Sequence, residues 1–194
     1  MYISSIDLII IVSSIAALTI VHFFQGRRIN LLVMRTVAQL LEHELRPVDK
    51  EYTLLSLYSG FHARYRLGDG KEVETYLILL PRYSILYLPI AKLLNKYDSL
   101  IIIQRTDKEI RKPIILKREN ESKIVKTIVE KHIKHIHQEK QTKIEQLERL
   151  VDEDVKLLAA YDNKIVLVQK LEFTKLKQQI RKVLRIINTI ELMT

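Results

Sequence analysis

The chain has 194 residues, with 32 Lys and Arg against 23 Asp and Glu, four Gly and no Cys. The lack of cysteine excludes disulfide scaffolds, cysteine-ligated zinc sites and thiol catalysis, and neither G-x-G-x-x-G nor G-x-x-x-x-G-K-[ST] occurs to form a phosphate-binding loop. A mean hydropathy of zero is high for a chain with 28% charged residues, so the apolar residues must be concentrated in one segment.

That apolar segment lies at the N-terminus, where 19 uncharged residues separate Asp7 from Arg27. As a helix they would cover roughly 28 Å, close to the ~30 Å hydrocarbon core of a bilayer. A signal peptide and a wholly buried core helix are the alternatives. No basic residue precedes Arg27 and no small-x-small cleavage site follows the run, so we expect a transmembrane anchor over 1–26. The hydroxyl side chains that could make polar contacts within the bilayer are Ser13, Ser14 and Thr19.

The charges beside the span predict its orientation. Asp7 precedes it, whereas Arg27, Arg28 and Arg35 follow it. By the positive-inside rule, this single-pass protein has its N-terminus outside and residues 27–194 in the cytosol. All 32 basic residues and 22 of the 23 acidic ones follow the span, which gives this part a net charge of +10. A basic surface beside a membrane suits anionic lipid head groups or RNA.

The cytosolic part is predicted to form one α+β domain with a mostly antiparallel sheet and several amphipathic helices. Its first helix spans 28–45 and buries a stripe formed by Leu31, Met34, Val37, Leu41 and Leu45. A hairpin meander follows, with strands over 52–58, 61–67 and 72–80. In the second strand, Phe61, Ala63 and Tyr65 share one face. The later elements are a helix over 85–97, strands over 99–105 and 113–118 (an edge strand, with Pro113 at its start), helices over about 120–138 and 142–160, a strand over 164–173 and a helix over 174–192.

Two clusters of ionisable residues resemble sites but are predicted to be solvated helix surface. A helix cannot bring all three of His132, His135 and His137 together, and the acidic residues 152–154 point in different directions. We therefore predict no catalytic residue, no metal and no cofactor, and a non-enzymatic protein. A hydrolase site assembled in space is the alternative.

The last helix has the strongest amphipathic pattern. Its apolar stripe is formed by Leu176, Ile180, Val183, Ile187 and Ile190. The basic residues proposed to bind a partner lie on this helix and beside the anchor: Arg27, Arg28, Lys175, Lys177, Arg181, Lys182 and Arg185. Tyr83, Tyr87 and Tyr97 surround the apolar run ILYLPIAKLL, which suits either core packing or a patch facing the membrane or a partner.

The order of these features also resembles a known family. A transmembrane helix leads into RINLLVMRTVAQLLE, then YSGF, LLPRYSILYLPIAKLL, a DSLIII strand, LLAAYDNKI and a basic helix. Over about residues 8–190 this resembles the membrane-anchored core of the calumin family, coiled-coil-domain proteins of the endoplasmic reticulum that pair with Asterix in the PAT complex. That complex shields incompletely folded transmembrane segments at the multipass translocon and contacts the ribosome and the Sec channel.

The resemblance implies a factor that assists membrane-protein insertion or folding. Its expected partners are the membrane, a translocon or a small membrane protein, client transmembrane segments, and the ribosome or its RNA. Family members also carry an acidic lumenal region and a long basic coiled coil; this sequence shows neither, so the resemblance implies no calcium binding. The compact, isoleucine-rich chain suits a minimal archaeal relative. The alternative is a membrane-tethered module that binds lipid or RNA.

Overall fold

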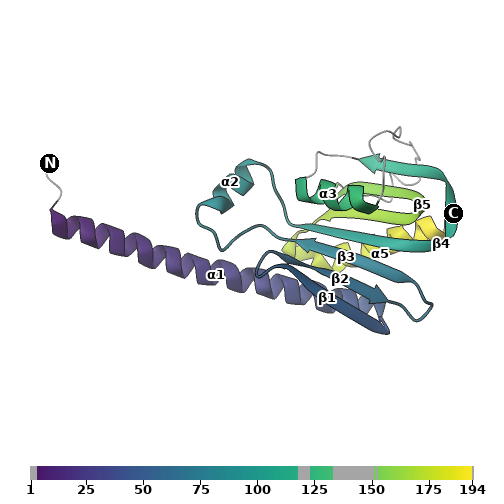
Figure 1. Ribbon diagram of the computed structural model, residues 1–194, viewed down its shortest axis with the longest axis horizontal. Coiled ribbons are helices and arrows are strands. Elements are labelled where there is room, and N and C mark those ends of the chain that lie inside the picture. The colour runs from purple at the N-terminus through teal and green to yellow at the C-terminus, as the bar shows by residue number, and fades with distance from the viewer. Residues whose placement is uncertain (1–3, 118–122, 133–150, 152, 194) are drawn as a thin grey trace.

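The computed structural model describes residues 4–117, 123–132, 151 and 153–193. One helix, α1 (Ser5–Leu45), contains both the apolar span and the predicted helix over 28–45, without a break at residue 26. Its first half projects away from the rest of the molecule, and its second half packs against a sheet (Figure 1). Ser4 caps its start together with Asp7 in a capping box. The expected α+β class is confirmed.

Among the described residues, the sheet has five antiparallel strands in the order β1-β2-β3-β4-β5. Their bounds are β1 Asp49–Ser56, β2 Gly60–Arg66, β3 Glu72–Ile78, β4 Ser99–Lys117 and β5 Val155–Lys170. The first three form the expected meander. As predicted, β2 buries Phe61, Ala63 and Tyr65 on one face, and the opposite face carries its basic residues.

The two long strands correct the predictions for the second half of the chain. Residues 99–117 form one strand rather than two, with irregular pairing between Arg105 and Ile114. The predicted helix over 142–160 is wrong for the residues that the structure describes. Positions 151, 153 and 154 are loop and turn, and the segment from Val155 onward pairs with β4; Leu158, for example, lies opposite Leu116. The part of this prediction over 142–150 lies outside the described residues. Cross-strand partners far away in sequence decided the structure of an apolar run that is also compatible with a helix. The far half of this hairpin bends back over the sheet (Figure 1).

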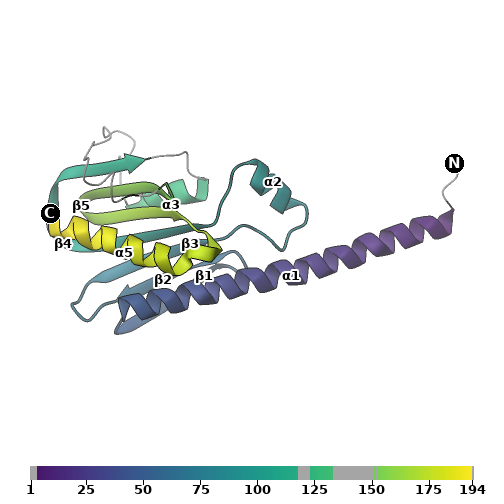
Figure 2. The same cartoon turned by 180° about the vertical axis from the view of Figure 1, so that it is seen from behind.

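Helices cover both faces of the sheet. The second half of α1 and helix α5 (Leu176–Met193) lie on one face (Figure 2), and α3 (Lys123–His132) lies on the other. The predicted stripe of α5 is buried throughout. In α1, however, Leu31 is 40% exposed, and the buried stripe consists of Gly26, Asn30, Val33, Met34, Val37 and Leu41.

Helix α2 (Tyr87–Leu93) is shorter than the predicted helix over 85–97. It lies beyond the end of the sheet, on the side from which α1 projects (Figure 1). A short 3-10 turn, η1 (Phe173–Lys175), connects β5 to α5. The projecting helix, α2 and the turn between β1 and β2 thus mark one end of the domain.

Candidate functional site at the junction of anchor and domain

The projecting half of α1 is long and apolar enough to cross a membrane, and none of its apolar window is buried in the domain. Ile6 and Leu18, for example, are 68% and 66% exposed. The alternative of a buried core helix is therefore wrong. This helix can serve as a membrane anchor, with its whole circumference open to lipid or to another helix.

Two of the three hydroxyls in the span are engaged by the helix itself. Ser14 Oγ donates to the carbonyl of Ile10, and Thr19 Oγ1 to the carbonyl of Ile15, both at 2.8 Å. Their protons are used in these bonds, whereas their lone pairs remain available to a donor on a neighbouring helix. Ser13 lies next to Ser14 on the exposed surface, and the three side chains do not share one face, because a helix turns by about 100° per residue.

Gly26 marks the point where α1 meets the domain. A Cβ added here would lie 2.2 Å from the carbonyl oxygen of Arg82 and 2.6 Å from the amide nitrogen of Tyr83. Only glycine lets the loop after β3 cross the helix at this distance. Arg27 and Arg28 follow immediately, so the crossing lies at the polar end of the apolar span.

One helical turn further, the buried side chain of Asn30 joins α1 to two loops. Its Nδ2 donates to the carbonyls of Tyr58 (2.7 Å) and Leu80 (2.9 Å), and its Oδ1 accepts from Arg82 Nη1 (3.1 Å). Arg82 also forms a two-pronged ion pair with the buried Asp98. This network fixes the direction in which the anchor leaves the domain.

Aromatic rings surround the same crossing. Phe23 of α1 makes edge-on contacts with Tyr58 and Tyr83, each at 6.2 Å between centroids. The guanidinium of Arg27 lies 4.7 Å from the centroid of the Tyr58 ring, within the range of a cation–π interaction. Tyr83 OH and Ser59 Oγ share a hydrogen bond of 3.0 Å. Tyrosine and arginine are the residues expected where a span enters the head-group region.

The apolar run ILYLPIAKLL is mostly exposed, which decides against core packing for its centre. Leu86 and Leu93 are 80% and 83% exposed, and Tyr87 is 44% exposed, whereas Ala91 is fully buried. Tyr83 and Tyr97, at the two ends of the segment, are half-buried. An apolar surface of this kind is unusual on a domain surrounded by water.

The basic residues proposed for partner binding do not form one cluster. Arg27 and Arg28 lie beside the anchor, and the other five lie along η1 and α5. Several of them interact within the chain: Arg181 Nε donates to Glu44 of α1 at 2.7 Å, and Lys175 pairs with Glu172 at 3.0 Å. Lys177 and Arg185 are exposed, and no ion pair joins either of them to another described residue.

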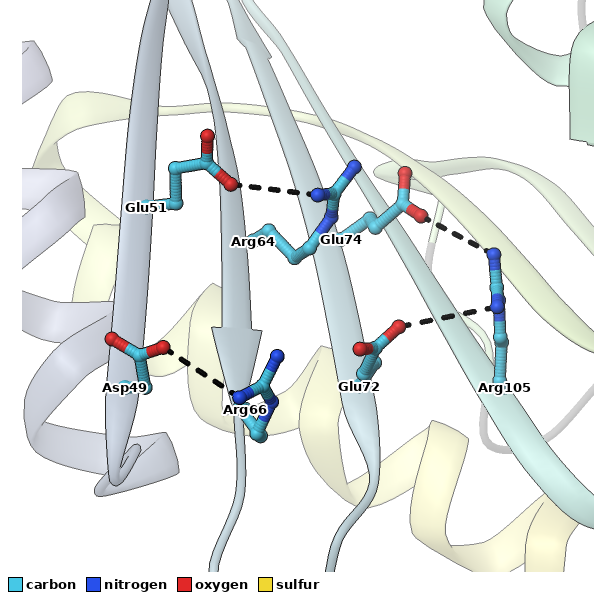
Figure 3. A pocket seen from close by; sticks show the side chains of 7 residues that line it. All are labelled: Asp49, Glu51, Arg64, Arg66, Glu72, Glu74 and Arg105. Carbon is cyan, nitrogen blue, oxygen red and sulfur yellow. Dashed lines mark hydrogen bonds and ion pairs between the residues drawn. The ribbon is translucent and has the colours of Figure 1, made fainter.

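A second collection of ionisable residues lies on the open face of β1 to β4 (Figure 3). On this face β1 and β3 carry acidic side chains, and β2 and β4 carry arginines. Arg64 therefore pairs with Glu51 at 3.4 Å, and Arg105 pairs with both Glu72 and Glu74 at 3.9 Å. We call this set the charge ladder; it surrounds a depression of about 140 Å³ and consists of Asp49, Glu51, Arg64, Arg66, Glu72, Glu74 and Arg105. Because each of the four carboxylates has an arginine partner, the ladder neutralises most of its own charge.

Next to the charge ladder, two histidines flank a buried carboxylate. The Nε2 atoms of His62 and His132 lie 3.5 and 3.8 Å from Glu74 Oε2, and the His62 ring stacks on Tyr76 at 4.3 Å. Burial lowers the pKa of both imidazoles, against the opposing effect of Glu74. His132 is therefore not on the solvated surface that we predicted for it; His135 and His137 lie outside the described residues. In the described part of the chain no three His, Asp or Glu side chains are placed to hold a metal ion.

Sequence reasoning missed the residues that join the anchor to the domain, Asn30, Arg82 and Asp98. A signal was available for Asn30, since a polar residue interrupts the apolar stripe of an amphipathic helix. Arg82 and Asp98 carry no such signal, because their pairing depends on the path of the loop between them.

The sequence matches no protein-family model and no curated protein.

Proposed function

We propose that this protein is a membrane-anchored, non-enzymatic factor that assists the insertion or folding of membrane proteins. One observation carries the proposal: the apolar half of α1 is exposed on all sides, yet its base is fixed in the domain through Gly26 and Asn30. A flexible tether would be enough to hold an enzyme near a membrane. A helix held in one direction instead offers a constant surface to other helices in the bilayer.

In this proposal the N-terminus lies outside, the domain lies in the cytosol and the anchor contacts client transmembrane segments. Ser13, Ser14 and Thr19 supply polar atoms to client helices that still carry unsatisfied donors. The likeness to the calumin family supports the same role beside a translocon or a small membrane-protein partner. The domain would then stand at the ribosome-facing side of the membrane, with its basic residues near ribosomal RNA.

Crosslinking from the anchor tests the client role. A photoreactive residue at position 13 or 19 in native membranes should crosslink newly made membrane proteins, and the crosslinks should disappear during a chase as these proteins mature. The same group at Ile124, an exposed position on α3 (58%), is the control and should not capture them. Crosslinks from the anchor to stable neighbours alone would contradict the proposal.

The exposed basic residues of α5 favour a second candidate, a membrane-tethered module that binds RNA or anionic lipid without a role in biogenesis. Co-sedimentation of the solubilised protein with ribosomes across a salt series, beside retention on protein-free RNA and on anionic vesicles, separates the two. A translocon factor should bind ribosomes at low salt more tightly than free RNA, whereas equal binding to free RNA, or retention on anionic vesicles without ribosome binding, would favour the second candidate.

A further inference from the structure

The exposed apolar surface of α2 lies beside the anchor and faces away from the domain. Leu86, the N-cap residue of α2, is followed at four- and three-residue spacing by Ile90 and Leu93, so the three form one stripe along the helix. They are 80%, 49% and 83% exposed. Ala91, on the inner side, is fully buried. The helix therefore carries large apolar side chains on its outer side, where a helix that packs on a core carries polar ones.

The segment that leads into α2 is held against the anchor by direct contacts. The loop that leads into it crosses α1 at Gly26, and Tyr83 in this loop contacts Phe23 near the end of the apolar span. The ion pair between Arg82 and Asp98 joins the two ends of the segment that contains α2. These contacts lie where the apolar residues of α1 give way to Arg27, and α2 lies beside the middle of α1 (Figure 1).

A second apolar point lies at the same end of the domain. The end of β1 and the turn to β2 expose Leu54 (58%), Leu55 (46%) and Leu57 (68%). Tyr58 in this turn contacts both Phe23 and Arg27 of α1. The turn is therefore held beside the anchor by direct contacts.

The polar atoms around α2 suit the head-group region. Lys96 Nζ donates to Tyr87 OH at 2.8 Å and lies 5.2 Å from the centroid of its ring, and Lys92 is exposed on the same helix. A tyrosine ring with amines beside it and leucines beyond it is typical of a segment that lies in a bilayer interface.

We propose that α2 and the β1–β2 turn insert their leucines into the head-group region of the bilayer that α1 spans. The domain then contacts the membrane at three points, the anchor, α2 and the turn, which set its orientation on the surface. This inference rests on the anchor crossing a bilayer but not on client binding, so it can fail while the client role stands, and the reverse.

Because the chain contains no cysteine, single labelling sites test the insertion directly. Nitroxide labels at Leu86→Cys, Leu93→Cys and Leu57→Cys in the full chain, reconstituted into vesicles of phosphatidylcholine and phosphatidylserine, should be more accessible to oxygen than to a water-soluble nickel chelate. Val48→Cys is the matched control, 77% exposed at the start of β1 and away from the anchor, and its label should remain in water. Labels on α2 as accessible to nickel as the label at Val48 would overturn the proposal.

A second pair of variants keeps the test quantitative. Burying one leucine side chain favours the inserted state by about tenfold or more, so Leu86→Glu should shift the label at Leu93→Cys toward water by at least about tenfold in the ratio of inserted to aqueous populations. Val48→Glu should leave that ratio unchanged. A label protected in native membranes but exposed in pure lipid vesicles would show that a protein covers α2, and would also overturn the proposal.

Discussion

Arg82 Nη1 donates a hydrogen bond of 3.1 Å to Asn30 Oδ1, which ties the loop after β3 to the middle of α1. The same guanidinium pairs with Asp98 and lies 4.6 Å from the centroid of the Phe173 ring. The side chain of Arg82 therefore connects α1, the end of the segment that contains α2, and the η1 turn that leads into α5. A change at this point should alter how the domain holds its anchor.

Removing Asp98, the ion-pair partner of Arg82, should strongly destabilise the folded protein. The side chains of Arg82 and Asp98 are only 17% and 6% exposed, so Asp98→Ala leaves a buried charge unpaired and should lower the free energy of unfolding by about 3–5 kcal/mol. Asp49→Ala is the control, because Asp49 and its partner Arg66 are 69% and 61% exposed; it should change stability by less than about 0.5 kcal/mol. Denaturant titration of both variants in detergent measures the difference, and equal effects would contradict the central role of this pair.

Gly26→Ala should separate the anchor from the loop that crosses it. The new methyl group would lie 2.2 Å from the carbonyl oxygen of Arg82, and backbone cannot move aside as a flexible side chain can, so we expect a loss of about 1–3 kcal/mol. Gly68→Ala is the matched control, since its Cβ would meet only Val48 Cγ2 at an ordinary 3.6 Å. A stability of Gly26→Ala equal to that of Gly68→Ala would show that the helix and loop are not in close contact.

The paired histidines predict a loss of stability in mild acid. Burial lowers the pKa of His62 and His132 below the ordinary value of 6.5, so below pH 6.5 the unfolded chain binds protons that the folded chain does not. Their contribution is fully present above this pH and is lost as the pH falls toward the lowered values. The melting temperature should therefore decrease between pH 7 and pH 5, and less steeply in the double variant His62→Gln, His132→Gln.

Two other titratable residues, His43 and Glu42, allow the effect of His62 and His132 to be distinguished. His43→Gln removes a solvent-exposed imidazole, 69% exposed, and should keep the wild-type slope. Glu42 acts in a lower range, because hydrogen bonds from Lys50 and Tyr52 lower its pKa from 4.5, so its contribution is lost only below that value. A double histidine variant with the wild-type slope between pH 7 and pH 5 would contradict the prediction.

The basic residues of α5 should differ in their effect on anion binding. Lys177→Gln and Arg185→Gln together remove two exposed charges and should reduce the salt dependence of ribosome or vesicle binding by up to about two units of slope. Arg181 is already paired with Glu44, so Arg181→Gln should have a smaller effect. Co-sedimentation across a salt series provides the slopes. A larger decrease in slope from Arg181→Gln than from the double variant would show that Arg181, rather than Lys177 and Arg185, contacts the anionic partner.

Much of the fold could be predicted where the pattern is local. The uncharged run before Arg27 forms the exposed apolar half of α1, as its length indicates, and the alternation of Phe61, Ala63 and Tyr65 predicted the correct buried face of β2. The five apolar residues of α5 recur at helical spacing and all are buried. These features depend on neighbours within one or two turns, which the sequence displays directly.

The wrong predictions concern residues whose structure depends on segments far away in the sequence. Residues after Val155 carry an apolar run that suits helix or strand, and only the pairing with β4 selects the strand. His132 was predicted to face solvent because its neighbours in sequence are polar, but β3 brings Glu74 and Tyr76 against it. The junction of anchor and domain depends on Asn30 and Arg82, which are 52 residues apart, so no spacing rule could have found it.

The unbroken path of α1 from span to sheet has a mechanical consequence. A helix of 41 residues without a hinge acts as a lever, because any tilt of its outer half must rotate the domain fixed to its inner half. Apolar spans tilt when the bilayer is thinner than they are long. A thinner bilayer would then act to rotate the sheet and its charge ladder relative to the membrane surface, against the contacts of α2 and the β1–β2 turn.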